Sequence, residues 1–272
     1  MIDFQNVSFS YGEESSGGGI RNVNLTINTG EFVLLTGESG CGKTTITRLV
    51  NGLVPHYYEG NLEGDVLLDG KSVSDTPLYD LAAMVGSVFQ NPKSQFFNVD
   101  TDSELAFACE NLGYPQEDIL KRIDRTVSDY HIEDLMGRSV FALSGGEKQK
   151  IACASSSVLL PGIMVLDEPS SNLDMAAIDD LRQVLSLWKK QGKTILIAEH
   201  RLYYLHDLAD RVLYVKDGEI EREYTPAEFD SLSDGTRKEM GLRPFSLSKL
   251  KPANQYQAHT AKQMEFQNFC FA

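Results

Sequence analysis

Basic residues, cysteine and long apolar runs are all scarce in this sequence of 272 residues. Lys and Arg together number 25 against 39 Asp and Glu, so the net charge is -14. Binding to a nucleic-acid backbone needs clustered positive charge, and we therefore expect no nucleic-acid partner. No apolar run approaches the roughly 20 residues that a helix needs to cross a bilayer.

The cysteines are few and scattered through the chain. They are Cys41, Cys109, Cys153 and Cys270. No pair of them has the spacing of metal ligands. The few cysteines, the acidic composition and the lack of a signal peptide favour a cytoplasmic protein with reduced thiols.

Strand and helix signals alternate along the chain, which is typical of an α/β fold with a mostly parallel sheet. Alternating apolar residues predict strands at 2–11 and 20–27, joined by a Ser/Gly-rich loop. Continuous apolar runs predict buried strands at 32–35, 85–89, 163–166, 194–198 and 212–215, with a shorter strand at 66–68. Helical spacing predicts helices at 43–51, 102–111, 116–130, 145–159 and 175–190. Asp217-Gly218 indicates a tight hairpin, and beyond residue 224 the pattern weakens.

A glycine-rich turn between the strand at 32–35 and the following helix has the residues of a phosphate-binding loop. It reads Gly37-Glu38-Ser39-Gly40-Cys41-Gly42-Lys43-Thr44 and fits G-x-x-x-x-G-K-[ST] at every fixed position. Glycines let backbone N–H groups wrap the phosphates, and the helix N-terminus adds a positive dipole end. We expect Lys43 to reach the β- and γ-phosphates and the Thr44 hydroxyl to bind Mg²⁺. The cofactors predicted are therefore ATP and Mg²⁺.

Two acidic residues follow the buried run at 163–166 and complete this prediction. Asp167 and Glu168 stand at the end of a parallel strand, at the sheet edge where ligands bind. We expect Asp167 to hold Mg²⁺ and Glu168 to orient and polarise the attacking water. Without the phosphate loop, a solvated acidic turn before Pro169 would be an equally good interpretation.

A third motif narrows the class of protein. Leu143-Ser144-Gly145-Gly146-Glu147-Lys148-Gln149 resembles the signature sequence of ABC (ATP-binding cassette) ATPases, and the resemblance extends over nearly the whole chain. It implies a P-loop NTPase core with a mostly parallel sheet, an N-terminal antiparallel β subdomain and an inserted helical signature subdomain at about 91–160. It also implies that Ser144, Gly145 and Gly146 bind the nucleotide held by a second cassette, whether fused or separate.

Other family motifs occur in the expected order. Tyr11 resembles the aromatic that stacks on adenine, and Thr45 extends the nucleotide-binding loop. Gln90 resembles the Q-loop glutamine, with an implied role in catalysis and at the metal, and His200 resembles the switch histidine. Ser171-Asn172-Leu173-Asp174 resembles the D-loop, with Asn172 where alanine is commoner. Each of these residues alone would indicate only a strand aromatic, a turn or a structural histidine.

Two further stretches resemble energy-coupling factor (ECF) importers. They are Phe89-Gln90-Asn91-Pro92 followed by Gln95-Phe96-Phe97, and Glu104-Leu105-Ala106-Phe107 with Glu110-Asn111-Leu112-Gly113. The resemblance implies an ATPase at the cytoplasmic face of the membrane that grips integral membrane subunits near the Q-loop. The cargo would be a vitamin or a transition-metal ion. Shared common residues in the helical segment are the alternative interpretation.

The last residues resemble the first. Residues 264–272 repeat the pattern of residues 2–10, with Phe4-Gln5-Asn6 recurring as Phe266-Gln267-Asn268. We predict a cassette at 1–243, a linker-like tail at 244–263 and the possible start of a second cassette at 264–272. Shared strand composition is the alternative explanation of the likeness.

Two other functions compete with an importer motor. A soluble ABC ATPase of DNA repair or translation is one, but repair members place a long coiled coil between Q-loop and signature, and only a short helical stretch separates Gln90 from Leu143 here. A non-catalytic nucleotide switch is the other, but Glu168 and His200 are both present. Residues 225–243 are expected to be helical, with a role that the sequence leaves open.

Overall fold

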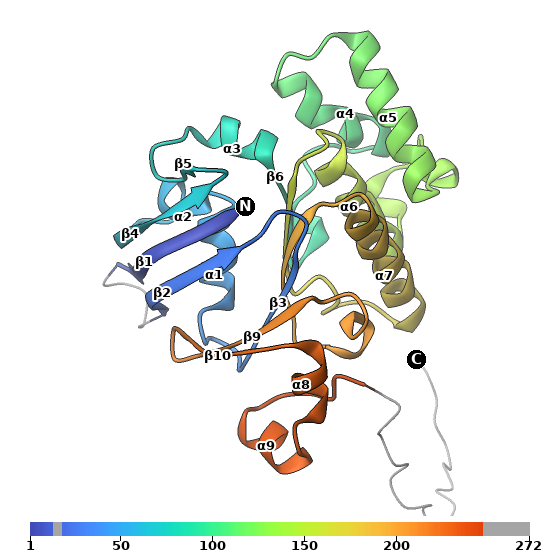
Figure 1. Ribbon diagram of the computed structural model, residues 1–272. Helices are drawn as coiled ribbons and strands as arrows, with labels where there is room; N and C mark the ends of the chain where they lie inside the picture. Colours follow the sequence, from blue (N-terminus) through green and yellow to red (C-terminus); the bar gives the residue numbers. More distant parts are fainter. Residues whose placement is uncertain (13–17, 247–272) are drawn as a thin grey trace, which may run out of the picture.

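The computed structural model describes residues 1–12 and 18–246, which form two β-sheets flanked by helices (Figure 1). The larger sheet has the order β10-β9-β3-β8-β7-β6 and is parallel except for β10, which pairs antiparallel with β9. Its strands are β3 (Phe32–Thr36), β6 (Val85–Val88), β7 (Ile163–Asp167), β8 (Thr194–Ala198), β9 (Arg211–Lys216) and β10 (Glu219–Tyr224). The predicted α/β class is confirmed.

The smaller sheet is antiparallel and has the order β2-β1-β4-β5 within the described residues. Its strands are β1 (Ile2–Tyr11), β2 (Gly19–Ile27), β4 (Gly60–Leu68) and β5 (Lys71–Ser72). The strand expected at 66–68 is only the end of β4. The first half of β4 has few apolar residues. It is a strand because β4 pairs with β1 along its whole length.

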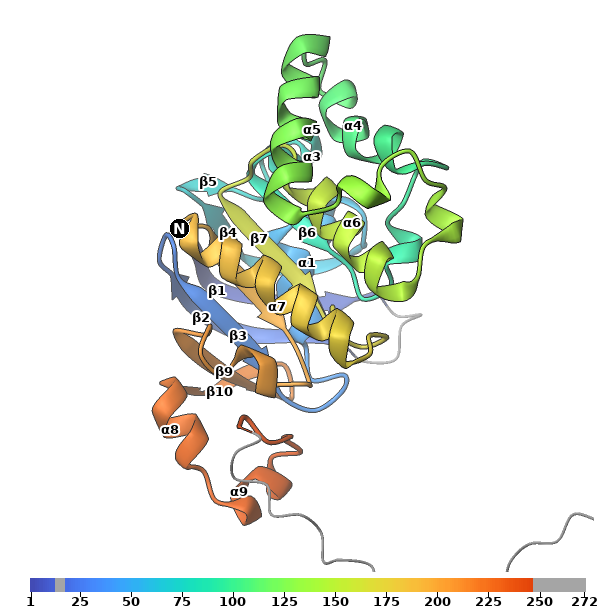
Figure 2. The ribbon, with the colours of Figure 1, turned by 90° about the vertical axis from the view of Figure 1, so that its right-hand side faces the viewer.

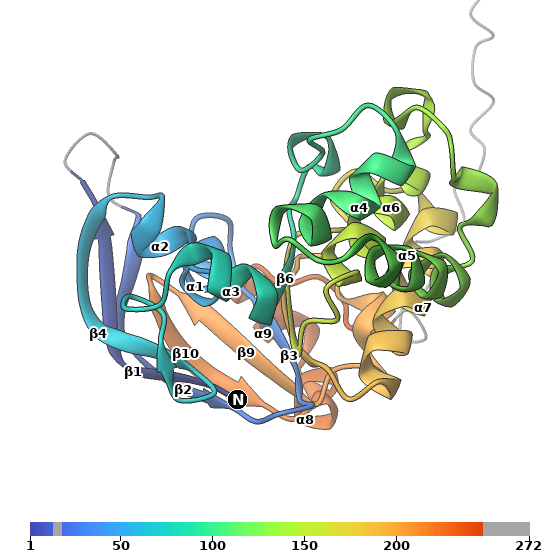
Figure 3. The same ribbon diagram turned by 90° about the horizontal axis from the view of Figure 1, so that it is seen from above.

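Helices lie on both sides of the larger sheet, and some of them pack outside those that contact it. They are α1 (Lys43–Val50), α2 (Leu53–His56), α3 (Leu78–Met84), α4 (Thr101–Asn111), α5 (Gln116–Tyr130), α6 (Gly145–Ser157), α7 (Met175–Lys190), α8 (Pro226–Ser231) and α9 (Asp234–Glu239). Short 3-10 turns lie at η1 (Pro92–Ser94), η2 (Glu133–Leu135), η3 (Val140–Ala142) and η4 (Tyr203–Leu205). Figure 3 shows α1 between the two sheets and α6 and α7 on the opposite side of the larger sheet, with α4 and α5 beyond them.

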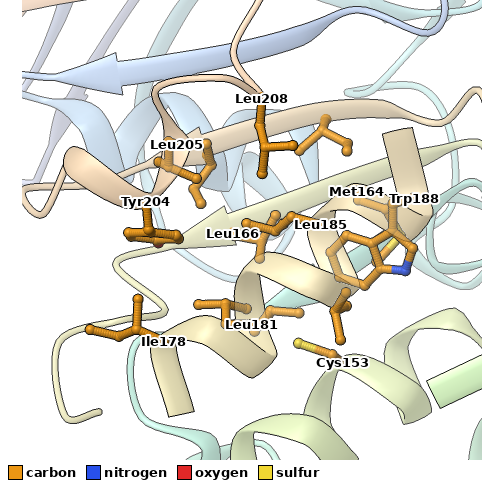
Figure 4. Close-up of a cluster of buried hydrophobic side chains, with 14 of the residues drawn as sticks. Cys153, Met164, Leu166, Ile178, Leu181, Leu185, Trp188, Tyr204, Leu205 and Leu208 are labelled. Carbon is orange, nitrogen blue, oxygen red and sulfur yellow. The ribbon is translucent and has the colours of Figure 1, made fainter. Parts of the chain in front are cut away.

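The buried strands separate two cores. Along β3, Phe32 and Leu34 face the core under α6 and α7, whereas Val33 and Leu35 face the core around α1 and the smaller sheet. Burial on both faces explains the continuous apolar run. Figure 4 shows the first core, where the fully buried Trp188 of α7 lies among leucines and its Nε1 donates to the Tyr130 hydroxyl.

The segment after Tyr224 is better packed than its weak pattern suggested. It forms α8 and α9, which Figure 2 shows below the larger sheet. Phe229 and Phe245 are fully buried, with ring centroids 5.2 Å apart. Helix in residues 225–243 is therefore confirmed, although a few apolar anchors, rather than a periodic face, hold it. The prediction for residues 264–272 lies outside the described residues.

Candidate nucleotide-binding site

The predicted phosphate loop joins β3 to α1 at the carboxyl edge of the larger sheet. Gly37 has φ +148°, and a Cβ there would lie 2.1 Å from the carbonyl oxygen of Val215 on β9. Only glycine fits, because the loop backbone presses directly against the neighbouring strand. Gly42 caps α1 in a left-handed conformation, with φ 110°. Gly40 is also left-handed, with φ +79°.

Lys43 is buried inside the curve of this loop. Its Nζ donates to the carbonyl oxygens of Gly37 at 3.0 Å and Glu38 at 2.8 Å, and it lies 3.6 Å from the Sγ of Cys41. A buried ammonium group needs such partners to offset its lost hydration. The loop thus holds a positive charge beside the backbone N–H groups that would wrap a phosphate chain.

Thr44 and Asp167 meet where a metal would be held. The Thr44 Oγ1 donates to Asp167 Oδ1 at 3.1 Å, which joins α1 to the end of β7. Burial raises the pKa of Asp167, and the hydrogen bond from Thr44 opposes this shift. A partly buried carboxylate beside a hydroxyl fits Mg²⁺, which takes one or two protein oxygens together with substrate phosphates and water. The pair therefore suits the metal expected with ATP.

Replacing Asp167 with asparagine should raise the Mg²⁺ concentration needed for half-maximal ATP hydrolysis by about tenfold or more, because an ionised ligand to the metal is lost. A magnesium titration of steady-state hydrolysis measures this value. Asp180→Asn removes a half-exposed carboxylate on α7 and is the control. An unchanged requirement in Asp167→Asn would remove Asp167 from the metal site.

Glu168 lies beside two other predicted site residues, Gln90 and His200. Its carboxylate Oε2 accepts a 3.1 Å hydrogen bond from Gln90 Nε2, and its Oε1 lies 3.1 Å from His200 Nε2 without the alignment of a hydrogen bond. Its backbone is left-handed, with φ 45°, and its N–H donates to the carbonyl of Ala198 on β8. Non-glycine residues held in this region often lie at active sites.

His200 is kept toward its neutral form. Burial and then the positive charge of Lys43 lower the pKa of His200, against the opposing effect of Glu168. A neutral imidazole has one donor and one acceptor nitrogen, so it can hydrogen-bond either a phosphate oxygen or water.

Glu199 is a functional residue that the sequence interpretation missed. It is 2% exposed, and its Oε1 accepts from the backbone N–H of His200 at 2.7 Å and of Arg201 at 3.0 Å. Its Oε2 accepts from the N–H of Ser170 at 3.3 Å and from the Tyr204 hydroxyl at 2.9 Å. The carboxylate therefore ties the histidine segment to the segment after Glu168. The sequence did hold a signal for Glu199. Like Asp167, it directly follows an apolar run that was predicted to be a buried strand.

Two hollows lie on either side of the phosphate loop. The first, of about 730 Å³, is lined by Tyr11 and by loop residues Glu38, Ser39, Gly40 and Cys41. The second, of about 430 Å³, is lined by Glu38 and Ser39 again, together with Glu168 and His200. A nucleotide base and ribose fit the volume of the first. The terminal phosphate would then point toward the second.

Tyr11 lies at the edge of the first hollow. Its hydroxyl lies 3.2 Å from Thr45 Oγ1 and accepts from Arg48 Nη1 at 3.0 Å. Its ring meets Phe9 edge to face, with centroids 4.8 Å apart. Tyr11 therefore lines the hollow, and Thr45 lies behind it and contacts its hydroxyl.

The signature residues lie apart from this cluster. Ser144 caps α6 in a capping box, where its Oγ accepts from the Glu147 N–H at 3.3 Å and its own N–H donates to Glu147 Oε2 at 2.7 Å. These hydrogen bonds and Arg138 lower the pKa of Glu147 to about 2. Among the described residues, no hydrogen bond or ion pair links Ser144, Gly145 or Gly146 to the phosphate loop. Their predicted role toward a second cassette stays a prediction.

Comparison with known proteins agrees with this geometry. Residues 20–171 match the family model described as ABC transporter, which covers more than half of the chain. The chain belongs to the ABC transporter family. The chain is 47% identical over 251 residues to a provisionally named ABC transporter ATP-binding protein of Treponema denticola, and the match covers 92% of this chain and 51% of that relative. The chain thus spans about half the length of the Treponema relatives that it matches.

Other matches cover a relative almost entirely. A Pyrococcus abyssi protein with the same description is 40% identical over 229 residues, which cover 84% of this chain and 81% of that protein. The structure of cbiO1 from Clostridium perfringens, part of the ABC transporter complex cbiONQ, aligns with TM-score 0.75 and 27% identity over 87% of this chain and 93% of that chain. A dimeric post-hydrolysis state of the cassette MJ0796, bound to ADP and Pi, aligns with TM-score 0.70 and 26% identity, covering 83% and 99%.

Membership of this family establishes the general activity. The ABC cassette is an ATPase that uses ATP with Mg²⁺, and cassettes of the family dimerise and work with membrane subunits. Within the parts of the chain that the structure describes, no helix is both long and apolar enough to span a bilayer.

Proposed function

We propose that this cassette is the motor of an ECF-type importer and couples ATP binding and hydrolysis to uptake of a vitamin or a transition-metal ion. The observation that carries the proposal is the hydrogen bond from Gln90 to Glu168. Gln90 lies at the start of the segment that leads from β6 to η1 and α4. A membrane subunit that moved this segment would therefore move the Gln90 amide relative to Glu168. The ECF-like residues at 89–97 and the likeness to cbiO1 also support it.

Each residue of the site would have a separate role in ATP hydrolysis. Glu168 would polarise a water for in-line attack on the γ-phosphorus, the bond to the β,γ-bridging oxygen would break, and the water proton would pass to the carboxylate. Lys43 would offset charge on the phosphates, and His200 would sense the γ-phosphate. Mg²⁺ held by Thr44 and Asp167 would neutralise developing negative charge. Ser144, Gly145 and Gly146 would serve the nucleotide of a second, fused or separate cassette.

The membrane partners would lie near the Q-loop, with the cassette peripheral at the cytoplasmic face. Phe97 is 76% exposed although its ring stacks on Phe107 with centroids 4.9 Å apart, and Val99 is 64% exposed. An exposed phenylalanine ring next to an exposed valine is unfavourable in water and favours an apolar partner. A helix of an integral membrane subunit is the partner that suits it here.

Substituting Phe97 with serine should abolish co-purification with the membrane subunits and ATP-driven uptake in proteoliposomes, while basal ATP hydrolysis by the isolated chain stays within about twofold. Leu120→Ser, at a 53% exposed position on α5, is the control and should leave uptake unchanged. Normal uptake by Phe97→Ser would contradict the docking site. If the purified transporter moved no vitamin or metal ion with the native cassette, the importer assignment itself would fail.

A further inference from the structure

The chain after α9 turns back toward the nucleotide site. Gly241 is left-handed, with φ +65°, and its N–H donates to the carbonyl of Lys238 at 3.2 Å. The N–H of Leu242 donates to the carbonyl of Arg237 at 2.8 Å. This pattern is a Schellman end, which reverses the chain direction after a helix. Residues 242–246 therefore leave α9 along a defined path.

Both ends of this path are anchored. The carbonyl of Met240 accepts from the Tyr214 hydroxyl at 3.2 Å. Phe245 is fully buried, with its ring 5.2 Å from Phe229 and 5.0 Å from His206. Arg243 lies between these two anchors, so its backbone position is determined by packing.

Packing places Arg243 at the second hollow, with Ser39, Glu168 and His200. The backbone comes close to the loop at Gly241, where a Cβ would lie 2.8 Å from the Glu38 Cγ. The charge of Arg243 also contributes to the lowered pKa of His200, after burial and Lys43. Arg243 therefore acts electrostatically on the catalytic end of the site.

The other cations near this hollow are already engaged. Lys43 donates to loop carbonyls, and the Arg201 guanidinium donates to the carbonyls of Leu173 at 2.9 Å and Ser171 at 3.4 Å. Arg243 is exposed, and within the described part of the chain its guanidinium makes no recorded hydrogen bond. Glu38 and Glu168 line the same hollow, so a phosphate entering it would need a cation with free donors.

We propose that Arg243 is a further ATP-binding residue, whose guanidinium contacts the γ-phosphate from the segment that follows α9. The proposal rests on the placement of the γ-phosphate beside Glu168 and does not depend on the importer assignment. An arginine fork can donate two hydrogen bonds to phosphate oxygens, and these are stronger than bonds between neutral groups. ADP lacks the γ-phosphate, so the contact would distinguish ATP from ADP.

Calorimetric titration of the full chain with Mg²⁺ and either ADP or the non-hydrolysable β,γ-imido analogue of ATP tests this contact. Arg243→Ala should weaken analogue binding about tenfold or more, as expected for a lost charge-assisted hydrogen bond, and change ADP binding less than about twofold. Arg243→Lys should fall between the native chain and Arg243→Ala. Arg222→Ala on β10 removes an exposed arginine elsewhere and should change neither affinity.

Equal loss of ADP and analogue affinity in Arg243→Ala would overturn the proposal, as would no loss of either. Unchanged affinity together with weaker analogue-driven association of two chains would also overturn it and would place Arg243 at the contact between cassettes. A native chain that bound neither nucleotide would instead contradict the site assignment as a whole, so the two failures are distinguishable.

Discussion

Glu168→Gln is expected to lower the steady-state rate of ATP hydrolysis by about 10²–10⁴-fold, because an amide cannot accept the proton of the attacking water. The side chain keeps its size and an oxygen able to accept the hydrogen bond from Gln90, so nucleotide binding should persist. Phosphate release measured against protein concentration, with ATP affinity measured in parallel, tests both statements. The native rate should rise faster than linearly with concentration, because two cassettes must close on ATP.

Glu117→Gln is the matched control for this substitution. Glu117 lies on α5, far along the chain from the site, with its side chain 81% exposed beside Lys121. Its replacement should leave hydrolysis unchanged. Hydrolysis retained in Glu168→Gln would show that another group activates the water. If the native chain bound ATP but hydrolysed none at any concentration, a second cassette or a membrane partner would be required.

Glu199→Ala should destabilise the fold by about 3 kcal/mol or more, because several buried donors lose their acceptor together. The orphaned groups are the N–H groups of His200, Arg201 and Ser170 and the Tyr204 hydroxyl. Urea denaturation followed by circular dichroism measures the loss in the free energy of unfolding. Hydrolysis should also fall where the variant is still folded, since the backbone that presents His200 loses its support.

A conservative substitution of Glu199 removes the charge of the side chain but keeps its shape. Glu199→Gln keeps one oxygen acceptor and should lose about 1–2 kcal/mol, the cost of a donor left without its partner. Glu117→Ala removes an exposed ion pair and should change stability by less than about 0.5 kcal/mol. A stable Glu199→Ala with native hydrolysis would show that water replaces the carboxylate.

The fold was predictable where the pattern is local. The apolar run at 32–35 and the helix from Lys43 appear in the structure almost as expected, because burial on both faces of a parallel strand requires uninterrupted apolar residues. The hairpin at Asp217-Gly218 is also confirmed. In contrast, α3 was not anticipated, and the first half of β4 was missed, because pairing with a distant strand, rather than its own residues, makes it a strand.

By itself, the sequence determined the chemistry of the site: a phosphate loop between strand and helix, and acidic residues at the end of the buried strand at 163–166. Parallel strands bring their carboxyl ends to one edge, so these residues had to meet. Only the tertiary structure decided that Gln90 and His200 both approach Glu168, that Glu199 supports His200, and that Arg243 reaches the second hollow. Except for the contact between the neighbours Glu199 and His200, these contacts join segments far apart in the chain. Side-chain packing across the sheet edge sets them, not any local period.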